Sequence, residues 1–323
     1  MNTYGIFCKS TLWRQCAIVG TFALLIAGGP LVNADDNGYS KGEHIEAGYE
    51  GWRENSDGTT TFFFGYMNEN WDEELDVPIG ENNFFSPGEF DRGQPTHFLP
   101  RRNRFTFEVV VPADWGDREL VWTITSNGKT RKAYATKLAD YVVDNNIIAS
   151  ETGSTGGGRT TPETRANVGP VSVLQGDTVD GKHVRNVRVG EKLTLVTKIT
   201  DDGIPKPRRR TTAGKSIPLM ERMMRPPGRA AVSKFNGLFH SWAVYRGEGS
   251  GIHFEQPQIK LWEDTRPAAN SPWGALWDPP AVPEDGMYSA TVTFDEPGTY
   301  MLWGRADDGA LYDDNYVTVN VSP

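Results

Sequence analysis

The sequence predicts an all-β protein of two antiparallel β-sandwich domains, and three observations predict it. Short runs of β-branched and aromatic residues alternate in polarity with a period of two, the pattern of half-buried strands. Turn sequences separate these runs, and the 323 residues include 35 Gly and 21 Pro. Between about residues 49 and 137, no long stretch shows the 3.6-residue period of an amphipathic helix.

The first 34 residues are typical of a secretory signal peptide. Lys9 and Arg14 supply positive charge, residues 16–27 are apolar, and Val32-Asn33-Ala34 places short side chains at the expected cleavage point. The apolar run is shorter than the roughly 20 residues that span a bilayer. We therefore expect an exported protein, in a periplasm or outside the cell, without a transmembrane segment after cleavage.

Cleavage would also remove both cysteines, Cys8 and Cys16, so the mature chain would have no disulfide. Loss of Lys9 and Arg14 would leave 31 basic against 42 acidic residues, a net charge of −11. Such an acidic chain disfavours nucleic acid as a partner and favours solubility and cationic partners.

Residues 35–148 are predicted to form the first sandwich. Residues 59–66 follow a Ser-Asp-Gly turn and are β-branched and aromatic, and residues 104–111 alternate so that Phe105, Phe107, Val109 and Val111 share one face. Residues 120–125 and 130–135 flank an Asn-Gly pair that favours a tight hairpin turn. A long loop, residues 68–103, is expected between two of the strands.

Residues 149–167 are rich in Gly, Ser and Thr, which predicts a flexible linker. Residues 168–323 then repeat the strand pattern at 193–199, 288–294 and 317–321. Two longer connections, near 204–238 and 256–285, are predicted to be insertions between strands.

The second half resembles the immunoglobulin-like domains of the polycystic-kidney-disease-repeat and cadherin-like superfamily, which are common in exported bacterial proteins. The resemblance covers roughly residues 168–323 and depends on segments that occur in one order: Val189-Gly190-Glu191-Lys192-Leu193-Thr194-Leu195, Thr200-Asp201-Asp202-Gly203, Ser241-Trp242, Glu296-Pro297-Gly298-Thr299-Tyr300 and Arg305-Ala306-Asp307-Asp308-Gly309. It implies a seven-strand Greek-key sandwich in which Trp242 is the core tryptophan and Tyr300 occupies the tyrosine corner. The N-terminal half resembles no family of known activity.

The long loop offers one speculative ligand site. Trp71, Glu73, Glu74 and Phe84 combine aromatic faces with carboxylates, as a sugar-binding site requires. The alternative is that the aromatic side chains only pack the loop against the sandwich.

A second speculative site is the basic stretch between Gly203 and Val232, which includes Arg208, Arg209 and Arg210. It suits docking to a membrane surface, an acidic glycan or a partner protein. The alternative is a surface loop whose arginines meet the protein's own acids.

Metal ligation has weak support, and we expect no cofactor. His44-x-Glu46 and His253-x-Glu255 could each begin a metal site, but no further ligand stands at a diagnostic spacing. Weak calcium candidates are Asp201, Asp202, Asp307 and Asp308, with Asp313 and Asp314 as further oxygen ligands nearby, although Asp-Gly is also ordinary turn chemistry.

These observations predict a non-catalytic binding or interaction module of the cell envelope, with an envelope polysaccharide or protein as its partner. No nucleophile motif is present, so we expect no enzyme activity. Two alternatives remain open: a secreted carbohydrate-active hydrolase with its site in the 68–103 loop, and a structural spacer in an envelope assembly.

Overall fold

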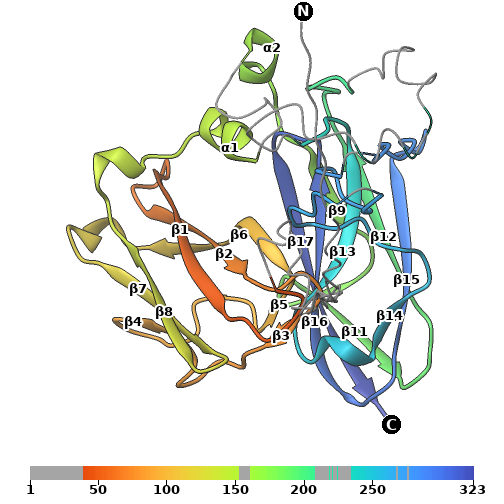
Figure 1. The fold of residues 1–323 in the computed structure, drawn as a ribbon, viewed down its shortest axis with the longest axis horizontal. Coiled ribbons are helices and arrows are strands. Elements are labelled where there is room, and N and C mark those ends of the chain that lie inside the picture. Colours follow the sequence, from red (N-terminus) through yellow and green to blue (C-terminus); the bar gives the residue numbers. More distant parts are fainter. Residues whose placement is uncertain are drawn as a thin grey trace, which may run out of the picture. The chain divides into compact units, whose positions relative to one another are not determined.

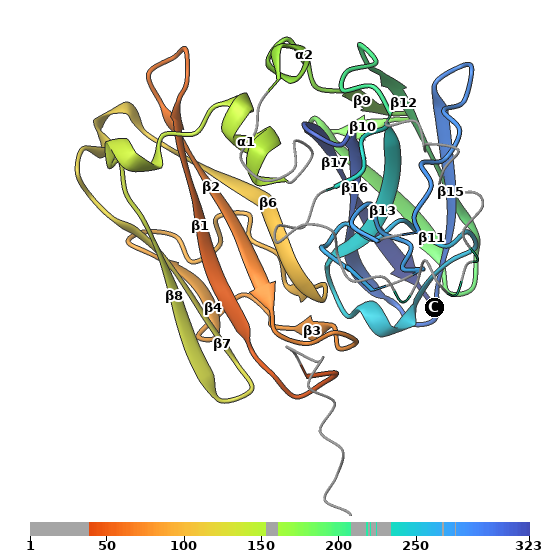
Figure 2. The same ribbon diagram turned by 45° about the horizontal axis from the view of Figure 1, so that its top comes forward.

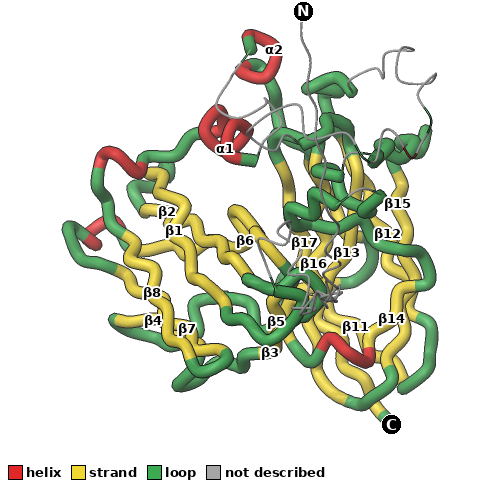
Figure 3. The backbone as a smooth tube through the Cα atoms, viewed as in Figure 1, coloured by secondary structure: helices red, strands yellow, loops and turns green. Residues whose placement is uncertain are grey.

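The computed structural model describes residues 39–152, 161–207, 218, 220, 224, 234–266, 268–274 and 276–323 (Figure 1). By contacts between Cα atoms, Gly38–Pro323 forms one compact unit. Its secondary structure is almost entirely strand, as the tube in Figure 3 shows. The all-β prediction is therefore confirmed.

The N-terminal half is a sandwich of two three-stranded antiparallel sheets with a small ribbon beside them. One sheet has the order β1-β2-β6, the other has the order β4-β7-β8, and β3 pairs with β5. The strands are β1 (Ile45–Glu54), β2 (Thr60–Asn68), β3 (Leu75–Asp76), β4 (Asn83–Ser86), β5 (His97–Phe98), β6 (Arg101–Val111), β7 (Leu120–Ser126) and β8 (Lys129–Ala135). The predicted hairpin turn joins β7 to β8, and both of its residues, Asn127 and Gly128, have the positive φ that this turn requires.

Helical segments in this half are short. They are η1 (Ala113–Trp115), η2 (Ala139–Tyr141), α1 (Asn145–Glu151) and α2 (Pro162–Arg165). Helix α1 begins at Asp144, whose side chain accepts a hydrogen bond from the Ile147 backbone N–H and so caps the helix. Residues 149–152 of the predicted linker belong to α1 and its end, where Ala149 and Thr152 are buried.

Aromatic side chains fill the space between the two sheets. Phe64 of β2 stacks on Phe107 of β6 with ring centroids 5.2 Å apart, and both rings meet Trp122 of β7 edge to face. Phe105 does not share this face, contrary to the alternation predicted for β6. A bulge opposite Gly65 and a positive φ at Phe105 turn its ring to Phe63, on the other face of the sheet.

The C-terminal half is a second sandwich. One sheet has the order β10-β11-β17-β16-β13 and the other has the order β14-β15-β12-β9. The elements are β9 (Val171–Leu174), β10 (Thr178–Val179), β11 (Lys182–Arg188), β12 (Leu193–Thr200), β13 (Phe239–Arg246), η4 (Gly249–Gly251), β14 (Ile252–Phe254), β15 (Met287–Phe294), β16 (Gly298–Asp307) and β17 (Tyr312–Ser322).

This strand order is that of an immunoglobulin-like Greek key. The first strand of the fold is split: β9 pairs with β12 in one sheet, and β11 runs parallel to β17 in the other. Trp242 of β13 is buried between the sheets with Leu302 and Val319. The Tyr300 hydroxyl donates a hydrogen bond of 3.1 Å to the Glu296 carbonyl, the contact of a tyrosine corner.

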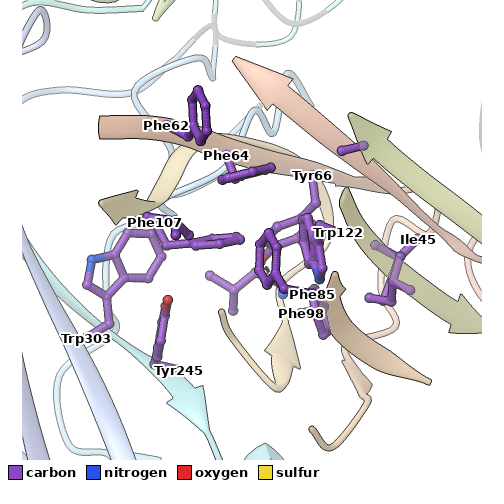
Figure 4. Packing of buried hydrophobic residues seen from close by; sticks show 14 of the residues in the cluster. Ile45, Phe62, Phe64, Tyr66, Phe85, Phe98, Phe107, Trp122, Tyr245 and Trp303 are labelled. Carbon is purple, nitrogen blue, oxygen red and sulfur yellow. Dashed lines mark hydrogen bonds between the residues drawn. The ribbon is translucent and has the colours of Figure 1, made fainter. Parts of the chain in front are cut away.

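The two sandwiches share one continuous core. Tyr245 and Trp303, from the outer face of the C-terminal sheet, belong to the same buried cluster as Phe107 and the other N-terminal aromatics (Figure 4). The connection near 256–285 joins this cluster through Leu261 and Trp277. It therefore packs as part of the body of the protein, and Figure 2 shows the two sandwiches of this unit side by side.

Candidate functional site: a cleft between the sandwiches

A cleft of about 950 Å³ lies where the N-terminal sandwich covers only part of the outer face of the β10-β11-β17-β16-β13 sheet. Its floor is formed by half-buried side chains of β16 and β17, namely Met301, Tyr312, Tyr316 and Thr318. A smaller recess of about 140 Å³ shares Glu108 and Tyr312 with the cleft.

The floor faces outward because β17 alternates. Val317, Val319 and Val321 point into the C-terminal core, so Tyr316 and Thr318 point away from it. One wall comes from β6, with Phe105, Phe107 and Glu108, and from the loop residues Asp91 and Gly93. The opposite wall is the turn between β10 and β11, at residues 181–183.

Hydrogen bonds between the two halves hold the walls of the cleft in place. The Tyr245 hydroxyl donates to the Gly93 carbonyl at 2.6 Å, and Arg246 donates to the Gln94 carbonyl at 2.9 Å. Arg246 also forms a bidentate pair with Asp91, at 2.7 and 2.9 Å. This pair lowers the pKa of Asp91.

Beneath the floor lies a buried ion pair. Arg305 of β16 is 5% exposed and binds Asp314 through two hydrogen bonds of 2.8 Å. It also donates to the Phe105 carbonyl at 2.7 Å, and its guanidinium lies 3.8 Å from the Tyr312 ring centroid. Asp314 is therefore committed to holding the floor, and Arg305 ties it to strand β6.

Glu108 differs from the other carboxylates of the cleft. Asp91 and Asp314 are paired with arginines, and Asp313 accepts two hydrogen bonds from Ser172. Glu108 has neither a hydrogen bond nor a cation within 4.0 Å among the described residues. The Glu108 carboxylate is open to the cleft, but protein surrounds it on several sides. The resulting desolvation raises the pKa of Glu108, although the positive charge of Arg53 acts to lower it.

The aromatic and acidic residues predicted in the 68–103 loop make contacts in different places. Trp71 lies under two guanidinium groups, with Arg101 at 4.4 Å and Arg266 at 4.9 Å from its ring. Phe84 packs on Phe90 at 5.0 Å, and Glu73 accepts a hydrogen bond from the Gly42 N–H at 2.6 Å. The contacts of these side chains are thus those of a packed loop.

The same loop contains a buried histidine between two acids. His97 Nδ1 lies 2.8 Å from Asp76, and Nε2 lies 3.0 Å from Glu74. Burial alone lowers the pKa of His97, but the hydrogen bonds and charges of Asp76 and Glu74 outweigh it and raise the pKa to about 9. Both ring nitrogens are occupied, so this histidine has no free atom for proton transfer to a ligand.

The calcium candidates are engaged with their own backbone turns. Asp202 accepts from the Val168 and Ile204 N–H groups, and Asp308 accepts from the Ala310 and Leu311 N–H groups. Asp201 accepts from the Gly203 N–H, and Asp307 is paired with Lys234. Burial, and then the charge of Asp307, raises the pKa of Asp308 to about 7.

Neither histidine motif gathers a ligand set. His44 lies between Glu43 and Glu46, with Lys129 and Arg131 bound to the same acids. His253 pairs with Asp295 at 2.7 Å, and Glu255 pairs with Lys192. In the part of the chain that the structure describes, no group of three or more His, Cys, Asp or Glu side chains could hold a metal ion. Arg208, Arg209 and Arg210 lie outside the described residues.

Of the residues that line the cleft, the sequence marks Asp313 and Asp314 as calcium candidates but does not mark Glu108, Tyr312 or Tyr316. Glu108 is an ordinary polar position on an alternating strand, and Tyr312 and Tyr316 lie about 200 residues further along the chain. The signal that was present is the split of β17 into an inward valine face and an outward face with Tyr316. An outward tyrosine on a central strand indicates that something covers that face of the sheet.

Neither a protein-family model nor a curated protein matches the chain. Among solved structures, the D00-D0 domain of intimin is 11% identical, with 87% of this chain and 100% of that chain covered at a TM-score of 0.24. Titin domains Z1Z2 in complex with telethonin are 11% identical, with 85% of this chain and 96% of that chain covered at a TM-score of 0.22. A nucleoside hydrolase-related protein from Saccharophagus degradans is 16% identical, with a TM-score of 0.23. The match covers 49% of this chain and 26% of that chain. At TM-scores this low, the strand order alone defines the fold.

No helix among the described residues combines the length and the apolar character needed to cross a membrane.

Proposed function

We propose that this protein is an exported, non-catalytic binding module of the cell envelope that binds a glycan in the cleft between its sandwiches. The cleft itself carries the proposal. Tyr312 and Tyr316 offer partly buried rings on a firm floor, and Glu108, Asp313 and Asn315 offer polar groups around them. A pyranose ring packs on aromatic faces while its hydroxyls take such polar partners.

The partners of the acids support binding over catalysis. Glycoside hydrolysis uses two carboxyl groups with separate roles. In the cleft, Asp91 and Asp314 are each paired with an arginine. Asp313 has no ionic partner but accepts hydrogen bonds from Ser172, so Glu108 has no unengaged second acid beside it. In the 68–103 loop, Glu74 is bound to His97 and Glu73 to the Gly42 backbone, which leaves the hydrolase alternative with less support there.

Isothermal titration with soluble oligosaccharides and retention on immobilised envelope polysaccharides test the proposal. Tyr316→Ala removes an aromatic face worth about 1 to 2 kcal/mol, so we expect affinity to fall about tenfold. Thr318→Trp fills the floor and should abolish binding. Tyr134→Ala, which alters an exposed tyrosine of β8 outside the cleft, is the matched control and should bind as the wild type does.

Two outcomes count against the proposal. If no glycan is retained, or if both cleft variants bind as well as Tyr134→Ala, the cleft is not a glycan site. Release of reducing sugars by the wild-type protein, lost in Glu73→Gln, Glu74→Gln or Glu81→Gln, would favour the hydrolase alternative. Co-purification with an envelope protein without any glycan retention would favour the structural spacer.

A further inference from the structure

We propose that the glycan bound in the cleft carries free amino groups, and that Glu108 receives one of its ammonium groups. This inference rests on the proposed function and names the chemical class of the ligand. The recognised unit would be a hexosamine whose nitrogen is not acylated.

Among the carboxylates that line the cleft, Glu108 is the one whose side chain has no hydrogen bond or ion pair within the described residues. It lies on β6 opposite Phe63 of β2, and its side chain points into the cleft. The Glu108 side chain is exposed, so a ligand cation can reach its carboxylate without displacing an ionic partner. The protein around the cleft raises the pKa of Glu108 by desolvation, and an ammonium group beside the carboxylate would act to lower it again.

The basic groups near the cleft do not neutralise Glu108, and Lys182, exposed on the opposite wall, forms no ion pair with it among the described residues. Arg246 is held by Asp91, and Arg305 is held by Asp314. Arg53 donates to Asn145 at 3.4 Å and lies over the Phe63 ring at 5.2 Å, so it acts on Glu108 only at a distance. His183 has a lowered pKa because of burial and the charge of Arg185, which favours its neutral form.

The net charge of the cleft also favours a cationic ligand. The lining contains four acids, Asp91, Glu108, Asp313 and Asp314, and two bases, Lys182 and Arg246. With the buried Arg305 below the floor, the cleft carries one net negative charge. An anionic polymer such as a sulfated or uronic glycan would place its charge beside Glu108 and Asp313, which the field of the cleft disfavours.

The floor adds a second attraction for an ammonium group. Cations are attracted to the faces of aromatic rings within about 6 Å of the centroid. Arg305 already occupies such a position on Tyr312. Tyr316 packs against Tyr245 at 5.0 Å with a tilt of 66°, and its ring lines the cleft. Tyr316 and Glu108 thus present a π face and a carboxylate to the same space.

The test compares three oligomers of equal length at pH 6 and low salt: glucosamine, N-acetylglucosamine and glucose. We expect the full-length protein to bind the glucosamine oligomer about tenfold more tightly than the other two, since one charge-assisted hydrogen bond to a ligand contributes about 1.4 kcal/mol. High salt should shrink this preference in the wild-type protein, with no variant required.

Glu108→Gln should remove the preference for glucosamine and leave binding of the neutral oligomers unchanged. Glu119→Gln, at an exposed acid outside the cleft, is the matched control and should keep the preference. Glu108→Asp keeps the negative charge on a shorter side chain and should keep part of the preference for glucosamine.

The outcomes separate the two proposals. If the neutral oligomers bind but glucosamine shows no advantage, or if Glu108→Gln keeps the advantage, the amino-glycan inference is wrong and the glycan-binding proposal stands. If none of the three oligomers binds and the polysaccharide screen is also negative, both are overturned.

Discussion

Replacement of His97 is expected to change how the stability of the protein depends on pH. His97 is 3% exposed, and its pKa is raised from 6.5 to about 9 by Asp76 and Glu74. Because the folded pKa lies above the unfolded one, this histidine stabilises the fold fully below pH 6.5 and ceases to do so as the pH rises through 9. The difference of 2.5 pH units corresponds to about 3 kcal/mol, of which about 2 kcal/mol should be lost between pH 7 and 9.5.

Few other groups confuse this window. The raised pKa of Asp308, about 7, has most of its effect at lower pH, and burial lowers the pKa of His240 to about 4, which also acts below pH 7. Seven tyrosines with raised pKa values, Tyr49 and Tyr288 among them, together cost about 1 kcal/mol by pH 9.5, in the wild type and in His97→Gln alike. The difference in decline between the two proteins from pH 7 to 9.5 should therefore belong mainly to His97.

The assay is urea unfolding followed by tryptophan fluorescence at several pH values. Across the window the wild-type protein should lose about 2 kcal/mol more unfolding free energy than His97→Gln loses. Glu74→Gln removes one of the two acids and should show an intermediate slope. A wild-type stability that is level from pH 7 to 9.5, or a wild-type decline no steeper than that of His97→Gln, would refute the reasoning.

Two further predictions concern the seam between the sandwiches. A Cβ on Gly249 would lie 2.3 Å from the His97 ring, so Gly249→Ala should cost about 1 to 3 kcal/mol in urea unfolding, whereas Gly251→Ala, whose added carbon meets nothing closer than 3.4 Å, should be nearly neutral. Equal losses in both would contradict the clash. Arg305→Ala leaves Asp314 buried without its cation and should lower the free energy of unfolding by about 3 to 5 kcal/mol. The double variant Arg305→Ala with Asp314→Ala should recover part of that loss. An Arg305→Ala variant as stable as the wild type would show that the pair does not hold the floor.

The sequence predicted the elements that depend on local chemistry. The valine alternation at 317–321 predicted β17, and Asn127-Gly128 predicted the β7–β8 hairpin, because side-chain period and turn conformation are set within a few residues. The C-terminal resemblance implied a seven-strand Greek-key sandwich; a sandwich is observed, and its two sheets contain nine strands among the described residues, β9 to β17. Phe105 was placed on the wrong face because a bulge shifts the register without a sequence signal that alternation can detect.

The cleft could not be predicted in this way. It requires Glu108 of one sandwich to lie near Tyr316 of the other, and no periodicity relates positions so far apart. The composition of residues 149–167 likewise gave no sign that Ala149 is buried, because the residues that follow it are mostly polar or glycine. In the structure, Ile148 and Ala149 pack with Leu311. The domain boundaries assigned from the sequence stay a prediction.

The aromatic cluster that runs from one sandwich into the other has a kinetic consequence for any ligand. Rotation of the halves about a hinge would pull Tyr245 and Trp303 out of contact with the N-terminal aromatics, so opening is opposed by the burial of several large side chains. A molecule that enters therefore meets preset walls, and its arrival should follow a single exponential whose rate rises in proportion to concentration. Saturation of that rate at high concentration would reveal a slow rearrangement that the packing forbids.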